Sequence, residues 1–396
     1  MKFVLFREGM TESLAFFSAK IARELERRGQ EVLLFDINDK TTQLPGLKQY
    51  LSGRDAILLT FNFGGIQREA IFYDEAYRLL WDLFEVRCVN VIVDHPLYYY
   101  RELLAPPEHY LQLCIDEGHA KYMRRYYPQI MLGETKPLPG SLGRGQEQSA
   151  CRPIRERTVL VAFTGNYTPP ERFTPYMERN GKEYEDFYHE ILEELKRHPF
   201  REIDEVCVEQ MNREMGELAP EQVTLAMSSL LFLDMAVRFW FRGEVVKGLL
   251  EQGIPVRIYG GGWEHLKTTG TDFLQCAGIR TSQECCDLFM DTRLSLNVMP
   301  WFKRGSHDRI YNSMRNGAVC VTDTSRFLTQ ELTDGENVVF YELTELELLP
   351  DRIKTLLRNE ERLQKIADAG RSFADREHNW SGYTDYLLQE IAKAEW

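Results

Sequence analysis

Basic side chains gather around one short segment of an otherwise acidic chain. The segment GSHDRIYNSMRNGAVCVTD covers residues 305–323, and the basic residues in it or just before it are Lys303, Arg304, His307, Arg309 and Arg315. The sequence of 396 residues has a formal net charge of -13 at pH 7, so composition alone does not explain this cluster. Guanidinium and ammonium groups form strong hydrogen bonds with phosphate and carboxylate oxygens. The segment therefore predicts a site for an anionic ligand.

The local structure expected for this segment supports the same chemistry. The strand-like run LSLNVM precedes the loop, and a helix should begin near His307 or Asp308, with Ser306 as the N-cap candidate. Free N–H groups and the helix dipole at such an end favour phosphate. The alternative is a solvated basic loop, and spacing alone does not separate the two. The position after a predicted parallel strand favours ligand binding, because ligands bind beyond the carboxyl ends of such strands.

Two glycine turns follow other predicted strands of the second half. The run GGGW, with Gly260, Gly261, Gly262 and Trp263, would let a ligand approach the backbone and would offer a flat apolar face for a base. The alternative is an ordinary turn followed by a core tryptophan. Likewise, Gly165 and Asn166 after the strand VLVAF suit a tight turn beside the ligand or a plain turn closed by prolines.

The first half of the chain offers acid–base candidates. Asp94 and His95 follow the strand CVNVIVD, where a carboxylate and an imidazole could supply a general base. The alternative is that Asp94 caps the next helix and His95 is structural. Glu8, in the segment REGMTES after the first strand, is a second candidate base, and FNFGG after another strand could touch the same ligand.

Strands and helices alternate along the chain, and this order predicts an α/β fold. Short apolar runs such as KFVLF, EVLLFD, DAILLTF, RTVLVAF, VRIY, LSLNVM and AVCVTD are separated by helical patterns, one of them expected at about 67–84. Such alternation is typical of doubly wound parallel sheets. We predict two Rossmann-like domains facing a cleft, over residues 1–150 and 151–380, with a helical insertion at roughly 170–252. A last helix, 381–396, should pack back on the body.

Composition excludes several classes of protein. An acidic chain is unsuited to general nucleic-acid or anionic-membrane binding, and the aromatic and basic run YMRRYYP is interpreted as an amphipathic helix end. No stretch approaches the length of a membrane span, and the start is too short for a signal peptide core. The eight cysteines and eight histidines show no metal-ligand spacing. We therefore expect a cytoplasmic protein with no protein-bound metal.

The second half resembles the donor domain of GT-B glycosyltransferases, most closely their CgeB-like, spore-maturation branch. The runs RIYGGGW, LSLNVMP, HDRIYNSMRNGAVCVTD and DGENVVFYE follow that branch in order. Its pattern R-x-[FY]-[ED]-x-[MA]-x-x-G is matched by Arg309, Tyr311, Asn312, Met314 and Gly317, with Asn in place of the usual acid. DAILLTFNFGG and VIVDHP are similar to the N-terminal domain that often precedes it.

The resemblance implies sugar transfer from a nucleotide-diphosphate sugar to an acceptor hydroxyl, without a metal or other cofactor. It places the base at the GGGW turn, the ribose at Asn312 and the diphosphate at the start of the helix, beside Ser306 and His307. Lys303, Arg304 and Arg309 would offset the charge of the leaving diphosphate. The acceptor, a glycan, a protein or a small molecule, would bind the first domain. Arg304 stands where retaining members carry the first of two glutamates, so the stereochemistry stays open. The alternatives are a non-catalytic glycan- or nucleotide-binding protein on the same fold, and a GT-B-like sugar-nucleotide epimerase.

Overall fold

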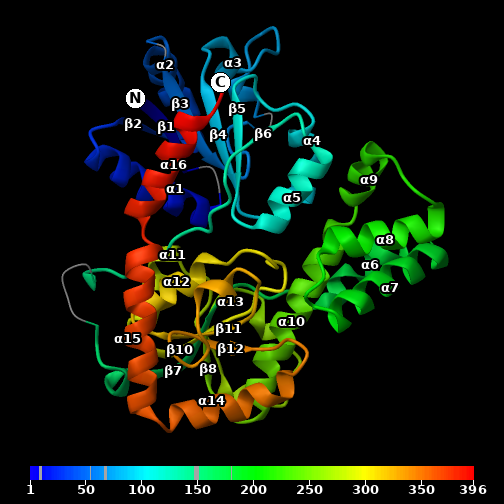
Figure 1. The fold of residues 1–396 in the computed structure, drawn as a ribbon, viewed down its shortest axis with the longest axis vertical. Coiled ribbons are helices and arrows are strands. Elements are labelled where there is room, and N and C mark those ends of the chain that lie inside the picture. The colour runs from blue at the N-terminus through cyan, green and yellow to red at the C-terminus, as the bar shows by residue number, and fades with distance from the viewer. Residues whose placement is uncertain (9–10, 54, 67–68, 147–150, 180) are drawn as a thin grey trace. The chain divides into compact units, whose positions relative to one another are not determined.

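The computed structural model describes residues 1–8, 11–53, 55–66, 69–146, 151–179 and 181–396. The chain divides into two compact units, Met1–Pro137 together with Trp380–Trp396, and Leu138–Asn379. Each unit contains one six-stranded sheet with helices on its faces (Figure 1). The paired strands of both sheets run parallel. This architecture is the predicted fold class of two doubly wound α/β domains.

The first unit is built on a sheet with the strand order β2-β1-β3-β4-β5-β6. The inner strands β1, β3, β4 and β5 are largely buried, as parallel strands covered on both faces must be, whereas the edge strands β2 and β6 are mostly half-buried. The bounds of the six strands are β1 Lys2–Glu8, β2 Glu31–Asp36, β3 Ala56–Phe61, β4 Arg87–Ile92, β5 Tyr110–Cys114 and β6 Met131–Leu132. Its helices are α1 Glu12–Arg27, α2 Lys40–Leu51, α3 Leu80–Leu83, α4 Tyr100–Leu103, α5 Glu117–Tyr126 and α16 Trp380–Lys393.

The helix expected at about 67–84 is much shorter in the structure. Its described residues contain a single 3₁₀ turn, Ala70–Phe72, and the four-residue helix α3. Between them the Asp74 carboxylate accepts the backbone N–H groups of Ala76 and Arg78. A side chain that binds the backbone in this way favours a turn over a helix.

The second unit has the strand order β12-β11-β10-β7-β8-β9. The strands are β7 Val159–Thr164, β8 Val256–Tyr259, β9 Leu274–Cys276, β10 Thr292–Asn297, β11 Val319–Asp323 and β12 Val339–Tyr341. Helices α11 Ser282–Phe289, α12 Asp308–Arg315, α13 Leu328–Glu331, α14 Leu349–Leu357 and α15 Glu360–Glu377 follow these strands. The predicted helical insertion consists of α6 Thr174–Glu178, α7 Lys182–Arg197, α8 Ile203–Met215, α9 Pro220–Met227 and α10 Leu231–Glu251.

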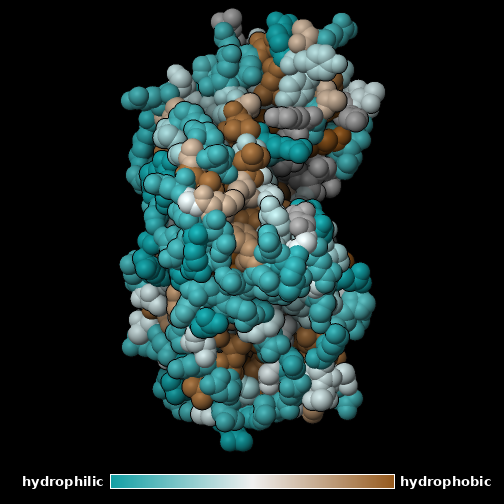
Figure 2. Space-filling model, turned by 90° about the vertical axis from the view of Figure 1, so that its right-hand side faces the viewer, coloured by the Kyte–Doolittle hydropathy of each residue, from teal (hydrophilic) through white to brown (hydrophobic). Residues whose placement is uncertain are grey.

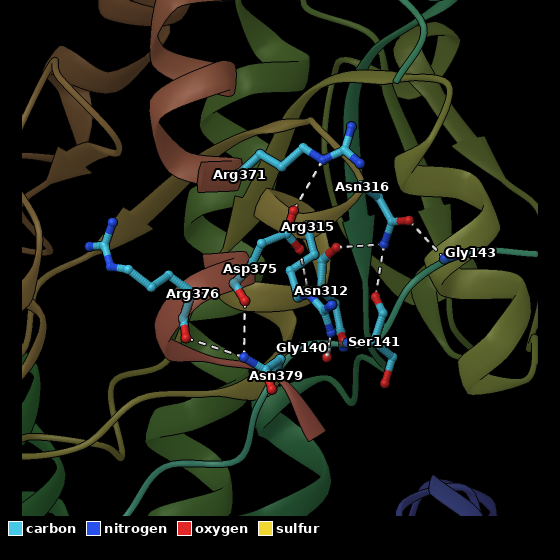
Figure 3. A network of polar contacts seen from close by, with 10 residues as sticks. All are labelled: Gly140, Ser141, Gly143, Asn312, Arg315, Asn316, Arg371, Asp375, Arg376 and Asn379. Carbon is cyan, nitrogen blue, oxygen red and sulfur yellow. Dashed lines mark hydrogen bonds and ion pairs between the residues drawn. The ribbon is translucent and has the colours of Figure 1, made fainter. Parts of the chain in front are cut away.

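The first unit ends earlier than the predicted residue 150, because the segment after Pro137 binds to α12. The Ser141 N–H donates to Asn312 Oδ1 at 2.6 Å and the Gly143 N–H to Asn316 Oδ1 at 2.7 Å. Arg315 donates to the carbonyl of Gly140 and also to Asp375 of α15 (Figure 3). These contacts tie residues 140–143 to the second unit.

The last helix packs on the first unit, although it follows the second unit in sequence. The ring of Trp380 lies 5.7 Å from that of Phe17 on α1, and Arg28 donates to Asp385 at 2.8 Å. In Figure 1 the red helix α16 lies beside the blue helix α1. The chain therefore contributes its two ends to the same unit.

Among the described helices, none alone has the length and apolar composition needed to cross a membrane. Only α9 and α10 taken together, with a bend of 51° between them, meet those criteria.

Candidate functional site

The guanidinium of Arg309 occupies the carboxyl edge of the second sheet. Its Nε donates to Thr164 Oγ1 at 3.0 Å, and its Nη1 donates to Asn297 Oδ1 at 2.7 Å. Thr164 ends β7 and Asn297 ends β10, two adjacent strands whose register pairs Phe163 with Leu296. The Arg309 residue is only 7 % exposed. Two neighbouring strand ends thus hold a buried cation in one orientation.

A relay of hydrogen bonds fixes the amide that holds Arg309. The Asn297 Nδ2 group donates to Thr322 Oγ1 at 2.9 Å, and the Thr322 hydroxyl donates to the carbonyl of Asp323 at 3.0 Å. Asn297 must therefore present its oxygen to the guanidinium. Burial is the main cause that lowers the pKa of Arg309, although an arginine remains charged in any case.

The third nitrogen of this guanidinium has no hydrogen-bond partner among the residues that the structure describes. Arg309 Nη2 lies beside Gly165, where an added Cβ would be 3.3 Å from it. No carboxylate in the described part of the chain forms an ion pair with Arg309; Asp308 and Asp323 act on it only through space. A buried cation without an ionic partner is costly. An anionic ligand at Nη2 would supply that partner.

The helix α12 begins at Asp308, as predicted, but its N-cap is His307 and not Ser306. His307 Nδ1 accepts the Arg309 N–H at 3.2 Å. The same Nδ1 lies 2.7 Å from Asp308 Oδ1, so a neutral imidazole makes only one of these two contacts at a time. Burial, and then the charge of Arg309, lower the pKa of His307. Ser306 is buried and its Oγ lies 2.8 Å from the hydroxyl of Tyr311, which is why it cannot cap.

The carboxylate of Asp308 reduces the positive potential at this helix end. Its Oδ2 accepts the Asn312 Nδ2–H at 2.7 Å, while Asn312 Oδ1 accepts from Ser141. Burial opposes ionisation of Asp308, but its interactions with His307, Arg309 and Asn312 outweigh burial and lower the pKa of this carboxyl. The strongest local attraction for an anion therefore comes from Arg309 and not from the helix dipole. The ribose contact predicted for Asn312 stays a prediction, and both polar ends of that amide already have protein partners.

The other two predicted cations point to the junction of α7 and α8. Lys303 Nζ donates to the carbonyls of Pro199 and Pro300. Arg304 Nε donates to Glu202 Oε1 at 3.0 Å, in an ion pair whose side chains are 27 % and 9 % exposed. A phosphate role for Lys303 or Arg304 stays a prediction, and it would require these bonds to break.

The glycine turns after β7 and β8 pack backbone against backbone. The Gly165 N–H donates to the carbonyl of Tyr259 at 2.8 Å, and Asn166 Oδ1 accepts the Gly261 N–H at 2.9 Å. A Cβ on Gly260 would lie 2.0 Å from the Gly165 oxygen, and one on Gly262 would lie 2.0 Å from the Tyr167 oxygen. Gly260 and Gly262 are therefore required for packing. This agrees with the alternative stated for the run GGGW, an ordinary turn followed by a core tryptophan.

Trp263 lies in the core, so its ring is not a surface for a base. The residue is 0 % exposed, its Nε1 donates to the carbonyl of Gly165 at 2.7 Å, and its ring stacks on Tyr167 at 5.0 Å. A ligand can reach the exposed Asn166 and the half-buried Gly165, Gly261 and Gly262 of these turns. Beside Gly261 lies the side chain of Ile279, which is 73 % exposed.

Sequence reasoning missed two arginines of α10. Arg242 donates to the carbonyl of Asn166 at 2.9 Å, and its guanidinium lies 4.8 Å from the ring centroid of Trp301. Arg238 lies 4.1 Å from the same ring and pairs with Asp234 at 3.0 Å. The signal was present, because Asp234, Arg238 and Arg242 recur every four residues on one face of an otherwise apolar helix.

Asp323, at the end of β11, is a third missed residue. It is 1 % exposed, its Oδ1 accepts the Met299 N–H at 2.8 Å, and its Oδ2 has no hydrogen-bond partner among the described residues. Burial raises the pKa of this carboxyl to about 7, against the opposing effects of the Met299 hydrogen bond and Lys303. The sequence signal that could have identified Asp323 is an acidic residue at the end of an apolar strand.

In the first unit, Asp94 and His95 follow β4 but face different surroundings. Asp94 is half-buried, and its Oδ2 accepts from Asn62 Nδ2 at 3.0 Å. His95 is 4 % exposed, and its Nδ1 accepts the Leu97 N–H at 3.1 Å. A neutral His95 with this bond carries its proton on Nε2, so neither nitrogen can accept another proton without losing the cap. The geometry favours Asp94 over His95 as a base. The side chain of Glu8, the last residue of β1, lies outside the described part of the structure.

The described residues contain no group of three or more His, Cys, Asp or Glu side chains that could hold a metal ion.

Comparisons with known proteins agree with this architecture. Residues 241–389 match the family described as Glycosyl transferase-like. No curated protein matches the sequence. Among solved structures, the chain is similar to sucrose-phosphate synthase from Thermosynechococcus elongatus, with a TM-score of 0.53 and 9% identity over 99% of this chain and 98% of that one.

Two further structures align over 100% of both chains. One is an alpha-glucosyltransferase in complex with UDP-glucose and DNA, with a TM-score of 0.55 and 12% identity. The other is HepE from Anabaena in complex with UDP-glucose, with a TM-score of 0.53 and 10% identity. At such low identity these similarities concern the fold, and they do not distinguish the CgeB-like branch. The chain has the GT-B fold of glycosyltransferases, and its residues 241–389 match the glycosyl transferase-like family model.

Proposed function

We propose that the chain transfers a sugar from a nucleotide-diphosphate sugar to an acceptor hydroxyl. The observation that carries the proposal is Arg309, a buried cation without an ionic partner in the described residues, at the carboxyl edge of a parallel sheet. Diphosphate is the ligand that would satisfy it, and the matched family and the UDP-glucose complexes of similar structures favour a nucleotide sugar. We further expect a hexosyl donor, a cytoplasmic enzyme and no cofactor.

In this proposal Arg309 Nη2 hydrogen-bonds the diphosphate and offsets the charge that develops on it as the sugar leaves. A fixed cation in a water-poor site stabilises such charge without rearrangement. Gly165 leaves room for the phosphate because a side chain there would press on Nη2. The base would bind near Asn166 and Gly261, and Asp94 of the first unit would deprotonate the acceptor if the enzyme inverts. No metal is needed in this scheme.

The test is calorimetric titration of UDP and of uridine into the wild type and the Arg309→Ala variant. We expect UDP affinity to fall by about 10- to 150-fold, the loss of a hydrogen bond to a charged group, with little change for uridine. The control is Arg358→Ala, since Arg358 is exposed and its side chain has no partner among the described residues. Equal losses for UDP and uridine would show that Arg309 does not bind phosphate.

Product analysis then separates the transferase from its alternatives. Wild-type protein is incubated with UDP-glucose, with and without candidate acceptors. A transferase gives a glycosylated acceptor, an epimerase changes the sugar without an acceptor, and a binding protein gives no product.

A further inference from the structure

The helical insertion of the second unit contains a pocket that the proposed sugar-nucleotide site does not use. Its volume is about 500 Å³, within the range of ligand sites in proteins. Residues of α7, α8 and the α9–α10 region line it, and its apolar part consists of Phe187, Tyr188, Met211, Ala226 and Leu230. Methionine and aromatic side chains of this kind adapt to the shape of a partner.

The charged residues that line this pocket are all acidic. Its lining includes Glu183, Asp186, Glu190 and Glu214 and no lysine or arginine. Asp186 is paired with Lys182 at 2.8 Å and Glu190 with Arg213 at 3.8 Å. Glu183 and Glu214 form no ion pair with any residue that the structure describes. Two carboxylates beside an apolar pocket therefore remain available to a cation from outside.

Exposed apolar side chains surround the same pocket. Tyr184 is 54% exposed and Met215 is 60% exposed, and both belong to its lining. Leu225 on α9 is 58% exposed. Figure 2 views the molecule from the side on which α7, α8 and α9 lie in Figure 1, and hydrophobic residues are scattered there among hydrophilic ones. A small molecule inside the pocket would leave these outer side chains in water, whereas a polypeptide segment could cover them.

We propose that this pocket binds a basic amphipathic segment of a partner protein. Apolar side chains of the segment would enter the pocket, as in helix-in-groove recognition, and its lysines or arginines would pair with Glu183 and Glu214. An anionic membrane surface is disfavoured because the acidic rim would be repelled by it. The proposal does not depend on the sugar-transfer function, since no residue of the candidate site lines the pocket.

A phage-displayed library of random short peptides, selected on the full chain at physiological ionic strength, tests this proposal. We expect enriched peptides that combine Lys or Arg with Leu, Phe or Trp. An enriched peptide is then labelled and titrated by fluorescence anisotropy. The double variant Glu183→Gln/Glu214→Gln should weaken binding by about tenfold, the effect of two exposed charge pairs.

A matched control removes the same charge elsewhere in the second unit. Glu336→Gln/Glu347→Gln changes two exposed glutamates that have no ionic partner among the described residues and do not line the pocket, and it should leave binding unchanged. The reversal Glu183→Lys/Glu214→Lys should change the selected peptides from basic to acidic. The proposal is overturned if no peptide is enriched, if both double variants weaken binding equally, or if the protein binds phosphatidylglycerol vesicles instead.

Discussion

Arg309 and His95 were predicted as site residues from the same sequence signal, a polar residue in the segment after a predicted strand. Each residue follows a parallel strand of a six-stranded sheet, and both are buried. Arg309 is held by two side chains and keeps Nη2 without a partner in the described residues. His95, in contrast, uses Nδ1 to cap the 3₁₀ turn Pro96–Tyr99 and packs 4.8 Å from the ring of His119. Position at a strand end therefore identifies candidates, and the contacts that each side chain makes decide between them.

The largest expected effect is a loss of turnover, and it tests the comparison at Asp94 and His95. Because the geometry favours Asp94 as the base, Asp94→Asn should lower turnover by about 10²–10⁴-fold and leave UDP binding intact. His95→Asn should keep turnover, because an Asn oxygen can still cap the turn. It should lower the free energy of unfolding, because the buried imidazole ring is lost. Steady-state kinetics with urea denaturation checks both. Loss of turnover in a well-folded His95→Asn variant would make the imidazole the base.

Asp323 predicts a pH effect on stability at the edge of the sheet that carries Arg309. Burial raises its native pKa to about 7, so the native state binds this proton more tightly than the unfolded state does. The resulting stabilisation is fully present below about pH 4 and is lost as pH rises to about 7. The loss should be about 4 kcal/mol. Urea denaturation over this pH range should show it in the wild type but not in Asp323→Asn; parallel curves would contradict the buried acid.

Two variants of the glycine turns test which glycine is needed for packing and which is needed for ligand binding. Gly262→Ala would place a Cβ 2.0 Å from a backbone oxygen at a φ of +84°, and should lower the free energy of unfolding by about 1–3 kcal/mol. Gly165→Ala presses on the side chains of Arg309 and Phe163 and also strains the backbone, because φ at this position is +151°. It should lower stability and should also weaken UDP binding. The two variants are compared by thermal unfolding and calorimetry. Similar stability losses with unchanged UDP affinity would assign Gly165 to packing alone.

A smaller effect is expected for Arg304, whose side chain is already paired with Glu202. Arg304→Ala should weaken UDP binding by less than about fivefold, because its guanidinium is directed to α8 and not to the sheet edge. The same titration as for Arg309→Ala measures this. A loss as large as that of Arg309→Ala would mean that Arg304 leaves Glu202 when the donor binds.

The smallest expected effect is that of removing metals. If Arg309 supplies the positive charge for the leaving diphosphate, transfer should continue at an unchanged rate in EDTA. Activity that disappears in EDTA and returns only with magnesium or manganese would contradict metal independence.

Local sequence patterns were enough to predict the alternation of strands and helices, the two α/β units and the helix that carries Arg309. These features depend on local periodicity and on the residues that begin and end each element, so they can be read from neighbouring positions. The strand ends could likewise be listed. Asp94, His95 and the glycine turns directly follow strands, and Arg309 lies on the helix that follows β10.

Long-range packing determines which of these residues keep a polar group available to a ligand. Trp263 is buried against Tyr167, Arg304 is paired with Glu202, and Ser306 is turned to Tyr311. Residues 138–146 belong to the second unit because α12 binds their backbone. Each outcome depends on contacts between residues far apart in sequence, and one chain alone does not reveal those contacts. Arg242 and Asp323 were missed for the same reason. Their burial depends on elements that are distant in sequence, and the local pattern does not show it.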